Sequence, residues 1–237
     1  MAEQGMRLDK LLAASGYGSR NDVKKLIRNG LVSVDGMTVR SADLKVRPDI
    51  QEIRVDDQPV IYEKYHYFML NKPAGYISAT SGGGPTVLDL IDEPYRDLFP
   101  CGRLDKDTEG LLLITDDGPL AHELLSPRHH VEKEYEVRLR NPFDQAYAEM
   151  FAAGMTLPDG TVFQPARLIQ TGENTCRIIL HEGKYHEIKR MFLAAGNEVV
   201  YLRRIRMKNL ELDESLAPGE YRKLSEEETA GLRALLR

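Results

Sequence analysis

Apolar residues near the start of the chain recur at the spacing of two short helices. Leucines at helical spacing predict a first helix over residues 7–14. Ser19 is a good N-cap for a second helix, which we expect to end at Gly30. Each helix would bury one apolar face and expose a polar one.

After these helices the apolar pattern becomes that of short strands. Residues 31–39 form two apolar runs on either side of Asp35-Gly36, a dipeptide that supplies the positive φ angles of a type I′ hairpin turn. Residues 53–55 predict a further strand, and the polar residues 56–64 predict a linker. We therefore expect a small sheet that packs on the two helices.

The rest of the chain alternates strand patterns with helix patterns. We expect strands at residues 67–70, 111–115, 133–139, 166–170, 176–180 and 199–204, and helices at residues 119–125, 143–153, from 188 onward and after Ser225. Asn71 begins a predicted turn that ends the first of these strands. The inward face of the strand at 133–139 is expected to exclude Lys133. The sequence thus predicts two domains, at residues 1–60 and 61–237.

Composition excludes several classes of protein. The chain has 237 residues, of which 42% are hydrophobic, and no apolar run approaches the length of a membrane-spanning helix. Its first residues lack the apolar core of a signal peptide, so we expect a cytoplasmic protein with no membrane segment. Cys101 and Cys176 lie far apart and form no CxxC pattern, which indicates neither a disulfide framework nor a zinc ribbon. Both are expected to be buried thiols.

The charge is unevenly distributed. The net charge of -5 and the isoelectric point near 5.8 argue against a protein that coats nucleic acid indiscriminately. Two segments nevertheless concentrate basic residues: the first contains Arg7, Lys10, Arg20, Lys24, Lys25 and Arg28, and the second contains Lys184, Lys189, Arg190, Arg203, Arg204, Arg206 and Lys208. In the first segment, Arg20, Lys24 and Arg28 share one helix face. Two basic segments on an acidic chain predict directed contact with phosphate groups.

A charged loop at residues 102–110 runs directly into the apolar strand at 111–115, and Asp105 lies in that loop. A carboxylate on a loop beside a buried strand is held by a rigid element, which suits catalysis. Loop aspartates also form turns and cap helices, and the local pattern leaves both roles open. Farther along, Lys189 flanks the apolar stripe of a predicted helix, so its ammonium can reach a neighbouring site while its stem follows the core edge.

Two histidines superficially match a zinc motif. His181 and His186 are five residues apart, whereas the HExxH motif needs a spacing of four to place both imidazoles on one helix face. The sequence therefore predicts no metal site.

Three short segments of the N-terminal module resemble the S4 RNA-binding domain, an accessory module of RNA-modifying and ribosomal proteins. They are Arg7-Leu8-Asp9-Lys10-Leu11-Leu12, Ser19-Arg20 and Gly30-Leu31-Val32-Ser33-Val34-Asp35-Gly36. The resemblance implies that this module contacts RNA, and the candidate residues are Arg7, Lys10, Arg20, Lys24 and Arg28.

Three further segments, in order along the chain, resemble the sequence motifs of pseudouridine synthases. They are Gly102-Arg103-Leu104-Asp105 with Thr108 and Gly110, then Lys133-x-Tyr135, then Glu182–Phe192, and the likeness extends to Asn71–Gly75 and Ser126–His130. The branch most resembled is the RsuA family, whose members modify uridine in small-subunit ribosomal RNA. A sister branch acts on large-subunit RNA and typically has Asn-Arg where this chain has Tyr185-His186. That difference and the segment Pro218–Tyr221 favour the small subunit.

By this resemblance the fold is α+β, with a small N-terminal S4-type domain followed by a catalytic domain on a long mixed, mainly antiparallel β-sheet with flanking helices. The implied reaction detaches uracil from C1′ of ribose, turns the base and rejoins it through C5, without a cofactor. The implied partner is ribosomal RNA or a small-subunit assembly intermediate, and we expect a monomer.

The resemblance also implies three catalytic roles. Asp105 matches the family's essential aspartate, which acts either as a nucleophile toward the sugar or base, or in removing the C2′ proton through a glycal; the sequence leaves both open. Lys189 matches a cation, more often Arg in the family, that favours the ionised carboxylate when the base encloses it. Tyr135 matches the residue that stacks on the uracil and is a candidate for proton transfer at C5.

An enzyme of this kind must extract its target base from folded RNA. Arg103 matches the residue that fills or stabilises the vacated space. Lys184, His186 and Arg190 are the candidates to hold phosphates near the target.

Other interpretations use the same residues. One is a synthase of large-subunit (23S) instead of small-subunit (16S) RNA, and another is a non-catalytic RNA-binding assembly factor. Intact Asp105, Tyr135 and Lys189 argue against the second. A glycosidase with Asp105 and Asp107 as paired carboxylates is a further alternative, but the basic segments fit RNA better than a neutral sugar.

Overall fold

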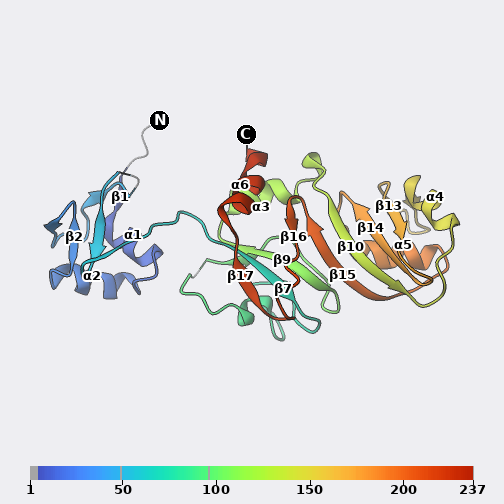
Figure 1. Ribbon diagram of the computed structural model, residues 1–237, viewed down its shortest axis with the longest axis horizontal. Helices are drawn as coiled ribbons and strands as arrows, with labels where there is room; N and C mark the ends of the chain where they lie inside the picture. The colour runs from blue at the N-terminus through green and yellow to red at the C-terminus, as the bar shows by residue number, and fades with distance from the viewer. Residues whose placement is uncertain (1–4, 49, 96, 237) are drawn as a thin grey trace. The chain divides into compact units, whose positions relative to one another are not determined.

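The computed structural model describes residues 5–48, 50–95 and 97–236, which divide into two compact units. The first unit runs to Tyr65 and includes a short segment that begins at Glu93. The second unit holds His66–Asp92 and the residues from Asp97 onward. Each unit has its own sheet and its own helices, as Figure 1 shows.

Two helices form one side of the first unit. They are α1 (Leu8–Ala14) and α2 (Arg20–Arg28). Ser19 caps α2 by accepting the Asp22 N–H, while the Asp22 side chain accepts the Ser19 N–H, so the predicted helix start is confirmed. Leucines of α1 and the apolar face of α2 are buried together with residues of the neighbouring strands. This burial gives the unit a core of its own.

Short strands complete the first unit. β1 (Met6–Arg7) pairs with β4 (Lys45–Val46), and a four-stranded sheet has the order β3-β2-β5-β6, formed by Met37–Thr38, Val32–Val34, Ile53–Val55 and Gln58–Pro59. The turn at Asp35 and Gly36 has φ angles of 51° and 77°, as the type I′ prediction requires.

Part of the predicted linker is a strand. Asp56 and Asp57 adopt φ angles of 49° and 61°, and the turn they form returns the chain along β5 as β6. Aspartate tolerates the left-handed conformation better than most residues, so Asp-Asp forms this turn where the sequence offered no glycine. Pro59 fits because β6 is an edge strand. The prediction that residues 56–64 are all linker was wrong for this hairpin.

The second unit is built on a nine-stranded sheet. Seven strands follow the order β13-β14-β10-β15-β9-β7-β17, with β16 paired to β15 and β8 to β9. Their bounds are β7 Tyr67–Lys72, β8 Phe99–Pro100, β9 Glu109–Thr115, β10 Lys133–Leu139, β13 Arg167–Gln170, β14 Thr175–Leu180, β15 Val199–Met207, β16 Leu210–Glu211 and β17 Tyr221–Lys223. Within the described residues the pairings are antiparallel except β15 with β9, which confirms the mixed, mainly antiparallel α+β fold.

Helices flank both ends of this sheet. They are α3 (Gly118–Leu125), α4 (Ala146–Ala152), α5 (Glu187–Ala194) and α6 (Glu226–Arg233), with short 3₁₀ turns at Val87–Leu90, Pro127–His129 and Ala234–Leu236 and a small hairpin of β11 (Met155–Thr156) and β12 (Val162–Phe163). In Figure 1, α3 and α6 lie together near β7 and β17, whereas α4 and α5 lie beside β13 and β14. The helix expected at residues 143–153 is shorter in the structure, where α4 spans only Ala146–Ala152.

Two predictions were wrong: the turn expected to begin at Asn71, and the exclusion of Lys133 from the inward face of its strand. Asn71 and Lys72 do not begin a turn, because β7 continues through both and their side chains are buried. Lys133 does not leave the inward face of β10. It lies two positions before Tyr135, so the alternation of strand side chains places both on the same buried side.

Two basic residues of β15, Arg204 and Arg206, have partners within the protein. Arg204 is fully buried and its Nε donates to the Leu111 carbonyl at 2.7 Å. Arg206 pairs with Glu132 and Glu134 at 3.0 and 2.9 Å. The prediction that this whole basic segment faces phosphate was therefore wrong for these residues, because cross-strand packing gives them internal partners.

Two smaller expectations can also be compared with the fold. Cys101 and Cys176 are free and buried, as predicted. Among the residues that the structure describes, no helix is long and apolar enough to cross a membrane.

Candidate active site

The loop that carries Asp105 is held from the neighbouring segments of the second unit. The Ser78 hydroxyl accepts the Leu104 N–H at 3.1 Å and donates to the Leu104 carbonyl at 2.9 Å. The Thr108 N–H closes a turn on the Asp105 carbonyl at 3.1 Å, and the Gly75 N–H donates to the Lys106 carbonyl at 2.7 Å. These bonds fix the backbone on both sides of the carboxylate.

Lys72, at the end of β7, supports the same loop through hydrogen bonds to its backbone. Its Nζ donates to the carbonyls of Pro73, Lys106 and Thr108 at 2.9, 3.3 and 2.8 Å, and its side chain is completely buried. Burial lowers the pKa of Lys72 to about 8, which leaves the ammonium protonated at neutral pH. Sequence reasoning missed this role. The available signal was a lysine at the end of a strand whose other residues are mostly apolar.

Asp105 lies against two residues of another segment. Lys189, on α5, places Nζ 2.8 Å from Oδ2 of Asp105, and His186, just before α5, places Nε2 3.5 Å from Oδ1. Both Asp105 and Lys189 have about a quarter of their side-chain surface exposed. The carboxylate is thus accessible to a substrate and is held by a cation that comes from 84 residues farther along the chain.

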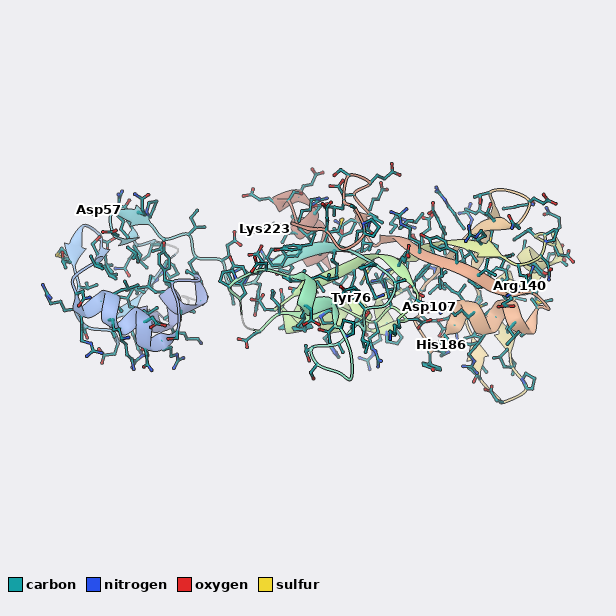
Figure 2. The ribbon with its side chains drawn as sticks, turned by 90° about the horizontal axis from the view of Figure 1, so that it is seen from below. Asp57, Tyr76, Asp107, Arg140, His186 and Lys223 are labelled. Atoms are coloured by element: carbon teal, nitrogen blue, oxygen red, sulfur yellow. The ribbon has the colours of Figure 1, made fainter. Side chains whose placement is uncertain are left out.

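Asp107 shares that cation. Its Oδ1 lies 2.6 Å from Nζ of Lys189, although sequence analysis assigned Asp107 no partner. Partial burial of Lys189 opposes its charge, but the hydrogen bonds to Asp105 and Asp107 outweigh burial and raise its pKa above the ordinary value. Burial also opposes the charge of Asp107, and the hydrogen bond from Lys189 lowers the pKa of Asp107. Figure 2 shows Asp107 and His186 next to each other, with Arg140 and Lys223 toward opposite ends of the unit.

Tyr135 reaches the same pocket from β10. The pairing of β10 with β15 shifts register between Glu134 and Tyr135, and the extra residue, Ile205, lies on β15, so the side chains of β10 keep their alternation and Tyr135 stays on the buried side. Tyr135 is only 7% exposed. Its ring is therefore fixed by packing on the wall of the pocket.

One pocket brings the predicted catalytic residues together. Its lining includes Asp105, Tyr135, Lys189, Arg103, Lys184 and His186. These six residues come from three segments of the sequence, which correspond to the three motifs that carried the resemblance. Their lining of one pocket is what a shared catalytic site requires.

Three residues predicted to contact RNA differ in their exposure and in their ion-pair partners. Arg103 is exposed at the edge of the pocket. Lys184 pairs with Glu182 at 2.7 Å, and Arg190, which does not line the pocket, pairs with Asp159 at 2.6 Å. The roles of all three in RNA binding stay predictions.

Two titratable residues are buried here: Glu187 lines the pocket, and Lys133 lies near Glu187. The Glu187 carboxyl accepts the Lys184 N–H at 2.8 Å, and burial raises the pKa of Glu187 to about 8 with a further contribution from the Glu182 carboxylate. Burial, with the nearby Arg204 charge, lowers the pKa of Lys133 to about 8. Burial therefore favours the protonated form of Glu187, which its position in the sequence did not reveal.

No metal site is seen in this part of the chain. Among the described residues, no group of three His, Cys, Asp or Glu side chains lies close enough to hold a metal ion. His186 is turned toward Asp105, and Nδ1 of His181 lies 2.8 Å from the His130 carbonyl.

The predicted RNA contacts of the first unit lie on its surface. Arg7 pairs with Asp9 at 3.0 Å, and Lys10 is exposed. Arg20 and Arg28 are exposed and Lys24 is half-buried; we call these three residues of α2 the α2 row. Among the described residues, no carboxylate lies within 4 Å of the nitrogens of the α2 row.

Comparison with known proteins agrees with the two units. The family model described as RNA pseudouridylate synthase matches residues 66–194, and the S4 domain model matches residues 6–49. The chain belongs to the RNA pseudouridylate synthase family. It is an RNA pseudouridine synthase, an isomerase that carries an N-terminal S4 domain.

Individual relatives match almost the whole chain. An uncharacterized RNA pseudouridine synthase of Bacillus subtilis is 48% identical and covers 94% of this chain and 96% of that protein. The ribosomal small subunit pseudouridine synthase A of Escherichia coli is 45% identical over 96% of this chain and 100% of that protein. A crystal structure of a pseudouridylate synthase matches with a TM-score of 0.69 and 38% identity, over 96% of this chain and 99% of that one.

Proposed function

We propose that the protein converts a specific uridine of small-subunit (16S) ribosomal RNA to pseudouridine, with Asp105 as the catalytic carboxylate. The observation that carries this proposal is the meeting of Asp105, Tyr135 and Lys189 in one pocket, with Nζ of Lys189 2.8 Å from the Asp105 carboxylate. The choice of RNA rests on the Escherichia coli relative, whose name assigns it to the small ribosomal subunit.

Each pocket residue has a part in this proposal. The Lys189 ammonium stabilises the negative charge of the Asp105 carboxylate when a uracil base covers the pocket and removes water from it. Tyr135, packed on the pocket wall, stacks on the uracil and is placed to transfer the proton lost from C5. Arg103, exposed at the edge, fills the space that the flipped nucleotide leaves in the RNA. Asp105 acts on the sugar or the base, and no step needs a cofactor.

The S4 domain, at residues 1–60, supplies affinity, and residues 61–237 supply catalysis. The α2 row has no internal ion-pair partner among the described residues, so its charges are available to RNA phosphates. Lys184, His186 and Arg190 hold phosphates nearer the target. The partner is ribosomal RNA or a small-subunit assembly intermediate, and the protein acts in the cytoplasm as a monomer.

The direct test is to incubate the purified protein with transcripts of 16S and 23S ribosomal RNA and to map pseudouridine by chemical modification and reverse transcription. We expect one strong new stop in 16S RNA and none in 23S RNA. A single site in 23S RNA would move the substrate to the large subunit. Tight RNA binding without any new pseudouridine, in free RNA or in assembly intermediates, would contradict catalysis.

A further inference from the structure

An aromatic pair stands on the surface next to the pocket. The ring of Tyr185 is stacked on the ring of His186, with centroids 3.8 Å apart and planes inclined by 17°. Tyr185 is nevertheless 76% exposed. One face of the tyrosine ring is therefore covered by histidine, and most of the remaining ring surface is open to solvent.

The backbone keeps this pair in place. His186 adopts the left-handed conformation, with φ 49° and ψ 33°, which costs free energy for a residue other than glycine. The Lys184 N–H donates to the Glu187 carboxyl at 2.8 Å, and the Glu187 N–H donates to the Lys184 carbonyl at 3.2 Å. These two bonds close the loop around Tyr185 and His186, so the stack forms part of an ordered turn.

The pair is continuous with the catalytic site. His186 lines the pocket, and its Nε2 lies 3.5 Å from Asp105. Tyr185 covers one face of the same imidazole and does not line the pocket. A planar group stacked on Tyr185 would thus lie one ring beyond the residue that contacts Asp105, at the position of a nucleotide next to the target.

We propose that the Tyr185–His186 stack is a platform for an unpaired nucleobase adjacent to the uridine being modified. This inference rests on the proposed function, because a neighbouring base is present only if a nucleotide enters the pocket. A nucleobase fits better than an aliphatic protein side chain, since the exposed surface is a flat aromatic face.

The platform has a definite role in the reaction. Extraction of a base from RNA breaks its stacking with its neighbours. Stacking of the adjacent base on Tyr185 replaces part of that lost contact and holds the opened RNA at the pocket. Base stacking tolerates different sequences, so the platform contributes affinity for an unpaired neighbour and not a choice among bases.

The experiment compares Tyr185→Ala, Tyr185→Phe and Leu193→Ala on a 16S RNA fragment that contains the mapped uridine. Leu193 is a matched control because it is 70% exposed on α5 and does not line the pocket. We expect Tyr185→Ala to raise Kd and KM about tenfold, which is the range of one base-aromatic stack. Tyr185→Phe and Leu193→Ala should stay within about twofold of the wild type.

A second comparison identifies the partner base. Fragments with an abasic nucleotide immediately 5′ or 3′ of the target should bind the wild type about tenfold more weakly at one of the two positions. With Tyr185→Ala, the same abasic position should cause no further loss. Additive losses at both positions, or equal losses for Tyr185→Phe and Tyr185→Ala, would overturn the platform.

The two proposals fail in different ways. If the wild type modifies no uridine in 16S RNA, the proposed function fails, and the same three variants are compared by binding to that RNA alone. If the wild type modifies its uridine while Tyr185→Ala matches Leu193→Ala in Kd and KM, the platform fails and the proposed function stands.

Discussion

The cations of the two units differ in what they contact. The α2 row has no carboxylate partner among the described residues. In and near the pocket, Lys184, Lys189 and Arg190 each contact a carboxylate within 3 Å. The α2 row and the cations near the pocket carry the same sign of charge. They differ in whether a carboxylate contacts them.

The difference suggests two uses of positive charge. Unpaired surface cations attract phosphates wherever the RNA backbone passes, and they release counterions when it binds. A cation held by two carboxylates has a defined position, which catalysis needs more than affinity does. We therefore expect the loss of the Lys189 charge to alter turnover and changes in the α2 row to alter binding.

Among the cations, the largest effect is expected at Lys189. Lys189→Met removes the charge beside Asp105 and should lower kcat about 100- to 1000-fold, similar to the loss of one preorganised electrostatic contact. KM should change little. The measurement is release of tritium from C5 of uridine in labelled RNA, followed at steady state over a range of RNA concentrations.

Lys189→Arg is the matched variant, because it keeps the charge and should keep most of the activity. Equal loss in Lys189→Met and Lys189→Arg would show that the position of the amine matters and its charge alone does not suffice. An unchanged kcat in Lys189→Met would contradict a catalytic role for Lys189.

A smaller effect is expected in the α2 row. Replacing Arg20, Lys24 and Arg28 together by Gln should raise Kd for ribosomal RNA roughly 10- to 100-fold and leave kcat unchanged, because three phosphate contacts are lost. The slope of log Kd against log salt should fall by about 2 to 3. Arg54→Gln, which removes a cation already paired with Glu52 at 2.6 Å, is the control.

If the triple variant binds RNA with the wild-type salt dependence, the α2 row does not contact phosphate. If it lowers kcat at saturating RNA, the separation of binding from turnover is wrong.

The smallest effect concerns Glu187 and depends on pH. Burial raises the pKa of Glu187 to about 8, whereas the unfolded chain ionises this group near 4.5. The stability it contributes is therefore fully present below pH 4.5 and is lost as the pH rises to about 8. The charged groups that face Glu187 are Glu182 and Lys184 of its own loop and Lys133 of β10.

Glu187→Gln imitates the protonated carboxyl and should remove this loss. Relative to the wild type, we expect the variant to gain about 1–3 kcal/mol in the free energy of unfolding between pH 5 and 8.5, measured by urea denaturation. Glu211→Gln, at an exposed position of β16, should show no such trend. A constant difference between Glu187→Gln and the wild type across this range would contradict the pKa shift.

Local patterns predicted the elements that local chemistry determines. The Asp35-Gly36 turn and the Ser19 cap are confirmed because each depends on neighbouring residues. The helix expected after Ser225 is likewise confirmed, because Ser225 and Glu228 form a capping box at the start of α6. The three motifs also predicted which residues would meet in one pocket, since each motif carries one of them.

Contacts set by packing were beyond local patterns. Lys72 reaches the Thr108 carbonyl across 36 positions, and Lys189 reaches Asp107 across 82. Arg204 looked like a surface cation in the sequence, but its place in the middle of the sheet buries it. Such contacts depend on which strands become neighbours, and the spacing of residues along the chain does not contain that information.

The measurement that tests the central claim most directly is pseudouridine formation by Asp105→Asn. Asn keeps the size of the side chain and loses the charge, so the variant should bind 16S RNA with wild-type affinity and form no pseudouridine. Glu198→Gln, which removes an exposed carboxylate paired with Arg140 at 2.6 Å, should modify RNA normally. Unchanged modification by Asp105→Asn would contradict the assignment of Asp105 as the catalytic carboxylate.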